Sequence, residues 1–376
     1  MWILFTKFKG SSGLILRSIT LKNFRTYRAE IFTFHKRFNL ISGDNAQGKT
    51  NLLEAIHFLC KFRPFKQVRL QELISFGETE GRIKGEIESS TGFNEIHILL
   101  TKDAKTVKLN GKIMYDISKL IGKFNVVTFL PSDMELVKGA PQNRRNYLDA
   151  FICNFTPEHI TDLKSYLRTL KQRNAFLIKM NKAQPETIDV WDEKIVELGS
   201  RMVKRRIKLV EKLEPILQKN YRLISGLNSK ITLEYKTSFK LGNNLEEELN
   251  RELKSKFQQD KRLGHTSVGP HRDIPGFKIN EKDASVFASQ GEAKTLVLAL
   301  KASEIELTKA MLKRTPILLL DDIASELDEK RKRFLFGLIG EFPGQIFITT
   351  TNPREIIYKD DKKVFYIRAG RAQAIV

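Results

Sequence analysis

One glycine-rich stretch contains residues whose types and spacing could do chemistry. It matches the pattern G-x-x-x-x-G-K-[ST] and reads Gly43-Asp44-Asn45-Ala46-Gln47-Gly48-Lys49-Thr50. Glycines at this spacing let successive backbone N–H groups curl around an anionic cluster of oxygens. The charge of Lys49 can then reach β- and γ-phosphates, and the hydroxyl of Thr50 can ligate Mg²⁺. The stretch therefore predicts a nucleoside-triphosphate site.

The neighbouring residues supply the two elements that must hold such a loop. The apolar run Phe38–Ser42 precedes it and predicts a strand, while the pattern from Asn51 to Leu59 predicts a helix. The N-terminus of this helix would add partial positive charge where the phosphates bind. Pro64 ends the helix because proline lacks a backbone donor. A chance match in a glycine-rich turn is the alternative, and this context makes it the weaker one.

A second set of functional groups follows an apolar run near the other end of the chain. The run from Pro316 to Leu320 predicts a buried strand, and Asp321 and Asp322 come directly after it. A carboxylate at this place holds Mg²⁺ opposite a phosphate loop, which assigns Asp321 to the metal. Asp322 stands where a base that activates water belongs. Acidic residues after a strand can also begin a turn, but the glycine loop favours the metal interpretation.

The composition indicates a partner that carries negative charge. Among 376 residues the chain has 65 Lys and Arg against 44 Asp and Glu, a net charge of +21. DNA or RNA is the first candidate, and a solvated lysine-rich surface is the alternative. We expect no membrane association, because no long apolar span or basic amphipathic anchor is evident. Two distant cysteines exclude a zinc ribbon and suggest the reducing cytosol, hence a cytoplasmic protein.

Patterns along the chain divide it into four segments. Residues 1–13 are predicted to be an extension outside the fold. Residues 14–130 carry strand patterns, with Asn110-Gly111 as a two-residue hairpin turn. Residues 131–288 are predicted to be an inserted, mainly helical lobe, because apolar residues recur there at helical spacing. Residues 289–376 return to a helix and buried strands, so we expect an α/β fold built from both ends of the chain.

The predicted helical lobe is basic and interrupted. Its charge is densest where five basic residues crowd together: Arg201, Lys204, Arg205, Arg206 and Lys208. A DNA-binding face and a solvated helix face are both open interpretations of this run. Proline is expected to break the helices at three places, Pro157, Pro185 and Pro215. The segment is therefore too short and irregular for an extended coiled coil.

The stretch Ser289-Gln290-Gly291-Glu292, which opens a helix, resembles the signature sequence of the ABC ATPase class. The resemblance implies that Ser289 and Gly291 bind the γ-phosphate held by another subunit's loop, so that ATP joins two copies of the chain. The run Ser325–Asp328 is similar to the D-loop of the class, which lines the same seam. An ABC-type core is thus expected, with catalytic roles for Lys49, Asp322 and Ser289 and with ATP and Mg²⁺ bound.

Five blocks of the sequence are similar to the RecF family of bacterial DNA replication and repair proteins. They are Leu21–Tyr27, Gly43–Asn51, Gly139–Asp149, Gly269–Asp273 and Leu318–Asp328. The resemblance implies an ATP-dependent protein of recombinational repair that binds single-stranded and duplex DNA at gaps. RecO and RecR are the implied partners, and weak, DNA-stimulated ATP hydrolysis is the implied switch. Asn51 joins the implied ATP-binding residues.

Some positions depart from these patterns. Asp322 is one methylene shorter than the usual glutamate, so slow hydrolysis is expected. Glu292 and Ala293 stand where the family is expected to carry paired glutamines, and His271 and Arg272 fit either a ligand contact or a structural turn. A transporter ATPase subunit would add a junction glutamine and a switch histidine, which this chain lacks. An SMC or Rad50-like protein would need a long coiled coil.

Overall fold

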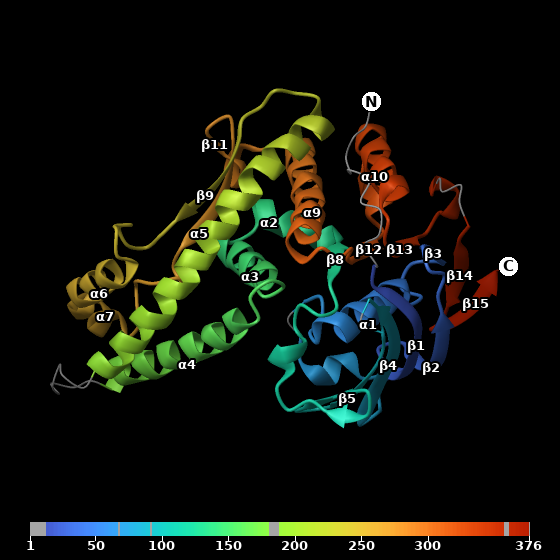
Figure 1. The fold of residues 1–376 in the computed structure, drawn as a ribbon, viewed down its shortest axis with the longest axis horizontal. Helices are drawn as coiled ribbons and strands as arrows, with labels where there is room; N and C mark the ends of the chain where they lie inside the picture. The colour runs from blue at the N-terminus through green and yellow to red at the C-terminus, as the bar shows by residue number, and fades with distance from the viewer. Residues whose placement is uncertain (1–12, 67, 91, 180–187, 357–360, 376) are drawn as a thin grey trace. The chain divides into compact units, whose positions relative to one another are not determined.

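A computed structural model describes residues 13–66, 68–90, 92–179, 188–356 and 361–375. The predicted N-terminal extension therefore lies outside the described residues, apart from Gly13. The chain forms two compact units, one made of residues 1–133 and 298–376 and the other of residues 134–297. The predicted domain boundaries, after residues 130 and 288, stay predictions. Figure 1 shows the elements of both units.

Mainly parallel strands form one sheet of the first unit. They are β3 Phe38–Ser42, β8 Val126–Phe129, β12 Ile317–Asp321, β13 Ile346–Thr350, β14 Lys363–Arg368 and β15 Arg371–Ile375. The order is β15-β14-β3-β13-β12-β8, and only β15 is antiparallel to its neighbour. Every residue of β3, β12 and β13 is buried, as expected for parallel strands that are covered on both faces.

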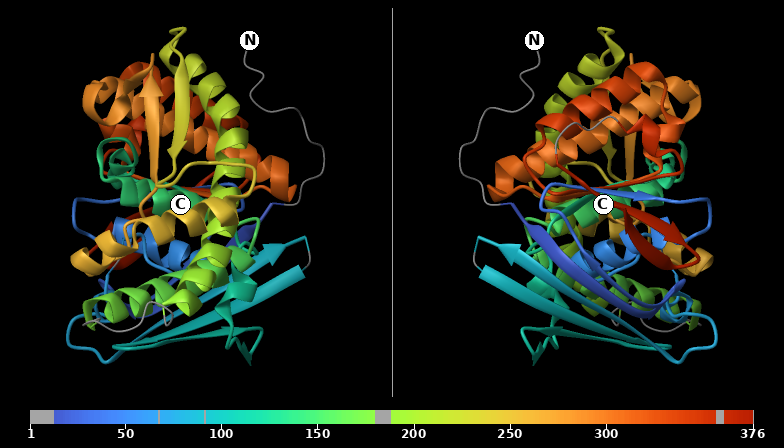
Figure 2. Two further views of the ribbon diagram at one scale, coloured as in Figure 1. Left: turned by 90° about the vertical axis from the view of Figure 1, so that its left-hand side faces the viewer. Right: turned by 90° about the vertical axis from the view of Figure 1, so that its right-hand side faces the viewer.

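Antiparallel strands form the second sheet of this unit, with the order β2-β1-β4-β5-β6-β7. They are β1 Ile15–Phe24, β2 Tyr27–Thr33, β4 Glu80–Ser89, β5 Gly92–Thr101, β6 Lys105–Leu109 and β7 Lys112–Ile113. The predicted hairpin at Asn110-Gly111 is confirmed, since both residues have positive φ and join β6 to β7. Figure 2 shows this sheet as a twisted array of long strands.

The helix α1, Lys49–Lys61, packs against both sheets of the first unit. It contacts β12 and β13 on one side and β1 and β4 on the other. Ten of its thirteen residues are buried, so apolar side chains from three layers share one core. The helix ends at Phe62, whose left-handed backbone closes the last turn just before Pro64. The loop in front of α1 is thereby fixed to the most buried part of the unit.

The second unit is built around the antiparallel helices α4 Glu158–Lys179 and α5 Asp189–Ser225. Its other elements are α2 Glu135–Lys138, α3 Pro141–Ile152, β9 Ile231–Lys236, α6 Leu245–Ser255, α7 Phe257–Leu263, β10 Ile274–Ile279, β11 Lys282–Asp283 and α8 Ala284–Phe287. A three-stranded sheet, β11-β10-β9, packs beside α5, so this unit is not wholly helical.

One predicted helix break is wrong. Pro157 lies between α3 and α4 as expected, and Pro185 lies outside the described residues. Pro215, however, stands inside α5, which continues through it to Ser225. Proline removes one backbone donor, and the buried face of α5, which includes Leu213 and Leu217 on either side of it, supplies the packing that holds the helix together.

The helix α9, Gln290–Leu312, begins in the second unit and ends in the first. It is followed after β12 by the short turn Ile323–Glu326 and then by α10, Glu329–Glu341, which Asp328 caps through the backbone N–H of Arg331.

In the described part of the chain no helix is both long enough and apolar enough to cross a membrane.

Candidate nucleotide-binding site

The predicted phosphate loop connects β3 to α1, and its two glycines are required by its geometry. Gly43 and Gly48 have φ of 145° and 115°. A Cβ atom on Gly43 would lie 2.3 Å from the carbonyl oxygen of Ile367, so no side chain fits there. Gly48 caps the N-terminus of α1. The sequence thus folds into a tight loop that leads directly into a helix N-terminus, the arrangement that suits an anion.

Lys49 is folded back into this loop. Its Nζ donates hydrogen bonds to the carbonyl oxygens of Gly43 and Asp44, both at 2.7 Å, and its side chain is buried. Burial lowers the pKa of Lys49, and the charges of Asp322, Asp321 and Asp44 oppose that shift. The nearby carboxylates favour the charged ammonium group in this buried place, where a phosphate oxygen would bind it strongly.

Thr50 and Asp321 come together although 271 residues separate them. The Thr50 hydroxyl donates to both carboxylate oxygens of Asp321, at 2.9 and 3.0 Å, and the Thr349 hydroxyl donates to Oδ1 at 2.8 Å. Burial raises the pKa of Asp321, and these hydrogen bonds act in the opposite direction. A hydroxyl and a buried carboxylate are the oxygen ligands that Mg²⁺ prefers, so the pair fits the predicted metal.

Asp322 differs from its neighbour in both backbone and partners. It has a left-handed backbone, with φ of 47°, and its N–H donates to the Thr349 hydroxyl at 2.9 Å. Its Oδ1 is buried and accepts no hydrogen bond from the described residues. A non-glycine residue in this conformation costs free energy, and such strain concentrates at functional sites. One acceptor oxygen of Asp322 is therefore held ready for a ligand or a water.

Two hairpin turns hold the phosphate loop from either side. From the β1–β2 turn, the Tyr27 hydroxyl donates to the carbonyl of Gly48 at 2.8 Å. From the β14–β15 turn, the N–H of Ala369 donates to Oε1 of Gln47 at 2.7 Å, and the N–H of Gly370 donates to the carbonyl of Gln47 at 3.0 Å. The side chain of Gln47, predicted as an ATP ligand, is therefore already committed to this second turn.

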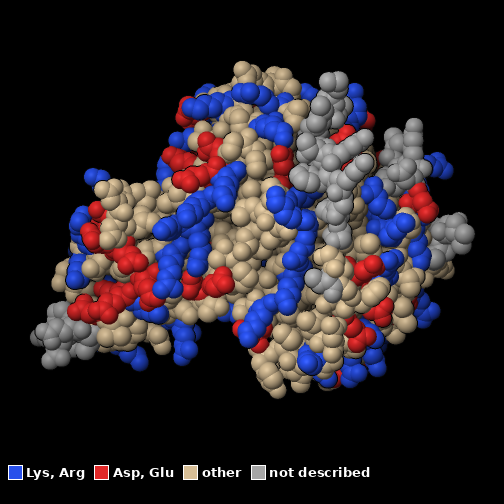
Figure 3. Space-filling model, in the orientation of Figure 1, with Lys and Arg blue, Asp and Glu red and all other residues tan. Residues whose placement is uncertain are grey.

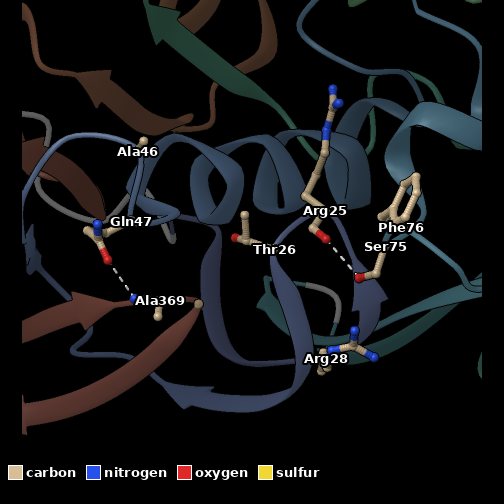
Figure 4. A pocket seen from close by; sticks show the side chains of 9 residues that line it. Arg25, Thr26, Arg28, Ala46, Gln47, Ser75, Phe76 and Ala369 are labelled. Carbon is tan, nitrogen blue, oxygen red and sulfur yellow. Dashed lines mark hydrogen bonds between the residues drawn. The ribbon is translucent and has the colours of Figure 1, made fainter.

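A cavity of about 340 Å³ opens beside the loop, within the range of small-ligand sites. Figure 4 shows Gln47 and Ala369 on one side of it and Arg25, Ser75 and Phe76 on the other. The remaining lining residues are Thr26, Arg28, Ala46 and Gly370.

The side of the cavity that contains Arg25 is held by an ion pair and also carries an exposed aromatic ring (Figure 4). The Arg25 guanidinium is held by the Glu54 carboxylate of α1 through contacts of 2.8 and 3.2 Å. Phe76 is fully exposed to solvent. Phe76, Ser75 and Ala369 are not among the predicted site residues. A fully exposed phenylalanine carries no periodic signal, and only the fold brings residue 369 to the loop.

The predicted signature residues start α9 as expected, but their donors are already in use. The N–H of Ser289 donates to the Glu292 carboxylate at 2.9 Å, and the N–H of Glu292 donates to the Ser289 hydroxyl at 3.2 Å. This reciprocal pair is a capping box. Ser289 and Gly291 belong to the second unit, whereas the phosphate loop belongs to the first.

His271 is part of the interior of the second unit. Its Nδ1 lies 2.7 Å from the Tyr166 hydroxyl and its Nε2 lies 3.1 Å from the carbonyl of Thr266. Burial lowers the pKa of His271 to about 4. Of the two interpretations open for this residue, the structural turn fits these contacts.

Comparison with known proteins covers nearly the whole chain. The family described as RecF/RecN/SMC N terminal domain matches residues 15–373. DNA replication and repair protein RecF of Streptococcus suis strain 05ZYH33 is 38% identical over 360 residues, which is 95% of this chain and 98% of the relative. RecF of Streptococcus gordonii is 37% identical over 94% of this chain and 99% of its own length. RecF of Geobacter sp. strain M21 is 36% identical over 95% of this chain and 99% of its own length.

Solved structures give the same result for the fold. The recombination mediator protein RecF-ATP in the RecFOR pathway superposes with a TM-score of 0.91 and 33% identity, covering 99% of this chain and 100% of that one. An Smc head domain from Pyrococcus furiosus superposes with a TM-score of 0.57 at 16% identity, covering 96% of each chain, and shows a shared fold alone. The predicted ABC-type α/β ATPase fold is thereby confirmed.

Proposed function

The chain belongs to the RecF family, and from this premise we propose that it is an ATP-dependent DNA-binding protein of DNA replication and recombinational repair. The single observation that carries the ATP part is the meeting of Lys49, Thr50 and Asp321 at the start of α1. Relatives described with ATP share the fold over the full length, which supports ATP as the nucleotide. The net charge of +21 supports DNA as the polyanion.

Within this proposal each residue of the site has a task. Backbone N–H groups of residues 43–50 and the charge of Lys49 hold the β- and γ-phosphates, with Asn51 at the edge of the site. Thr50 and Asp321 hold Mg²⁺, which neutralises charge on the phosphate oxygens when bound. Asp322 accepts the proton of the attacking water. The adjoining cavity, with Arg25 and Phe76 in its walls, takes the nucleoside part of ATP.

The signature helix gives ATP its second role. Ser289 and the N-terminus of α9 bind the γ-phosphate of a nucleotide held by a second copy of the chain. For that contact the capping box must open, because the Glu292 carboxylate and a phosphate would repel each other at the same donors. ATP then joins two chains on DNA and hydrolysis releases them. Proteins of the RecO and RecR type are the proposed partners at single-strand gaps.

DNA binding with and without nucleotide tests this function. Fluorescence anisotropy on gapped, duplex and single-stranded DNA should show tighter binding with ATP than with ADP or without nucleotide. Lys49→Ala should lose the ATP effect, because no other side chain of the loop supplies a positive charge to the β- and γ-phosphates. DNA affinity independent of nucleotide in the parent protein, or an ATP effect retained in Lys49→Ala, would contradict the proposal.

A further inference from the structure

The basic run in α5 is divided between the two sides of the helix. Arg205 and Arg206 point inward: Arg205 Nη1 donates to Asp162 at 2.6 Å, and Arg206 makes two contacts of 2.8 Å with the carboxylate of Asp149. These two guanidinium groups are therefore neutralised inside the unit. Arg201, which is half exposed, is shared between Glu197 and Asp162. Three of the five basic residues first singled out in this run thus serve internal ion pairs.

The outward side of α5 carries a different set of cations. Lys204, Lys208 and Lys212 are exposed and four residues apart, so they form one column along the helix. None of the three has an ion-pair partner among the residues that the structure describes. Lys219 and Arg222 lie on the same side of α5, nearer to its C-terminus. Between Lys204 and Arg222, Glu211 is the only exposed acidic side chain on this side of the helix. Figure 3 shows a band of Lys and Arg along this helix.

We propose that this outer side of α5 is a docking surface for the phosphodiester backbone of DNA. The inference rests on the proposed function, and it assigns the contact to residues that nothing else identifies. From Arg201 to Arg222 the helix rises about 30 Å, which is long enough to follow several successive phosphates. Lysine contacts a phosphate as a point charge and makes no contact with the base. The surface would therefore position the protein on DNA without selecting a base sequence.

Between Arg201 and Arg222, α5 exposes no large apolar side chain, and this favours its outer side over the comparable one on α4. Lys164, Arg168 and Lys171 are exposed on α4 and likewise have no ion-pair partner in the described part of the chain. That side, however, also exposes Leu167, at 49%, and Ile178, at 73%. Exposed apolar side chains among cations suit a protein partner better than a solvated phosphate backbone. The α4 set is therefore a control that matches in charge, exposure and unit.

Neutral substitutions at the two columns test the assignment. The variants are K204Q/K208Q/K212Q on α5 and K164Q/R168Q/K171Q on α4. Removing three duplex contacts should lower the slope of log K against log salt by about 2.7, and weaken binding on the order of a hundredfold at 0.1 M salt. The α5 variant should show this loss, and the α4 variant should keep the parent slope. Binding of ATP should be unchanged in both, because these residues belong to the second unit and the phosphate loop belongs to the first.

Each outcome decides one question. An α5 variant with the parent slope, or equal losses in both variants, would overturn the docking surface while leaving the proposed function intact. A parent protein whose DNA binding does not respond to ATP would instead contradict the proposed function. Circular dichroism of both variants checks that the helices are retained, and glutamine keeps a helix propensity close to that of lysine.

Discussion

At the residue scale, two adjacent carboxylates at the end of β12 stand in different surroundings. Asp321 is buried and receives hydroxyl hydrogen bonds from Thr50 and Thr349, and burial raises its pKa. Because its folded pKa lies above the ordinary value, its contribution to stability is greatest at acid pH and is lost as pH rises through the folded pKa. A cation bound to Asp321 would reverse that loss, and in this a metal ligand would differ from a structural aspartate.

Asp322 gives the first prediction, because one of its carboxylate oxygens lacks a partner among the described residues. Asp322→Asn should keep ATP binding, since the proposed phosphate contacts come from Lys49 and backbone N–H groups. It should slow hydrolysis about 10²- to 10⁴-fold, the usual share of a general base. Nucleotide binding by a fluorescent ATP analogue and single-turnover hydrolysis separate the two effects. Hydrolysis at the parent rate would remove Asp322 from the chemistry.

Gln47 gives the second prediction, because its side chain accepts the N–H of Ala369 at 2.7 Å. Gln47→Leu should raise the Kd for ATP about fivefold, which corresponds to one hydrogen bond of about 1 kcal/mol that no longer holds the loop. A parent Kd in Gln47→Leu would show that the β14–β15 turn does not shape the loop.

At the element scale, buried charged side chains connect the elements of the second unit. Arg206 joins α3, β9 and the segment before β10, through Asp149, the Tyr235 hydroxyl and the carbonyl of Pro270. Burial by itself raises the pKa of Asp149, but the charge of Arg206 and the hydrogen bond with His159 outweigh it and lower the pKa to about 2. Ionised Asp149 therefore stabilises the fold above its ordinary pKa near 3.9, and this stability is lost as pH falls toward 2.

The third prediction concerns this buried pair. Arg206→Ala should lower the free energy of unfolding by about 3–5 kcal/mol, because it leaves a buried carboxylate without its partner. The loss of stability between about pH 4 and 2 should also become smaller in this variant. Urea denaturation across that pH range measures both effects. Arg201→Ala on the same helix, whose side chain is 47% exposed, is the control and should change stability by less than about 1 kcal/mol. Similar losses for the two variants would contradict the role of the pair.

Elements with a strong local pattern could be predicted from the sequence. The strands β3 and β12 are short, mainly apolar runs, and the helix after the glycine loop has both a start and a stop signal. The pairing of β9 with β10 was missed, because Pro275 and Gly276 weaken the pattern of β10. The hydrogen bond from the β14–β15 turn to Gln47 joins residues more than 300 positions apart in the sequence. No local pattern encodes such a contact.

At the scale of the whole molecule, the phosphate loop and the signature residues Ser289 and Gly291 belong to different compact units of one chain. α9 connects them, since it begins at the signature and ends beside β12 in the sequence. In the first unit, Lys301 of α9 is buried and forms ion pairs with Asp133 at 3.3 Å and with Glu304 at 3.5 Å. These ion pairs fix α9 near the position in the sequence where the chain passes from the second unit to the first. A composite site between two copies of the chain requires a nucleotide bound by one unit and a signature carried by the other.

The central claim is that ATP joins two copies of the chain, and sedimentation velocity tests it most directly. The purified protein is measured with ATP, with ADP and without nucleotide, and Ser289→Arg, which blocks the helix N-terminus by bulk, is measured under the same three conditions. The parent should sediment as a dimer only with ATP, because ADP lacks the γ-phosphate that the second signature helix would bind. Ser289→Arg should stay a monomer while still binding ATP at Lys49. The same mass for the parent in all three conditions would contradict the account.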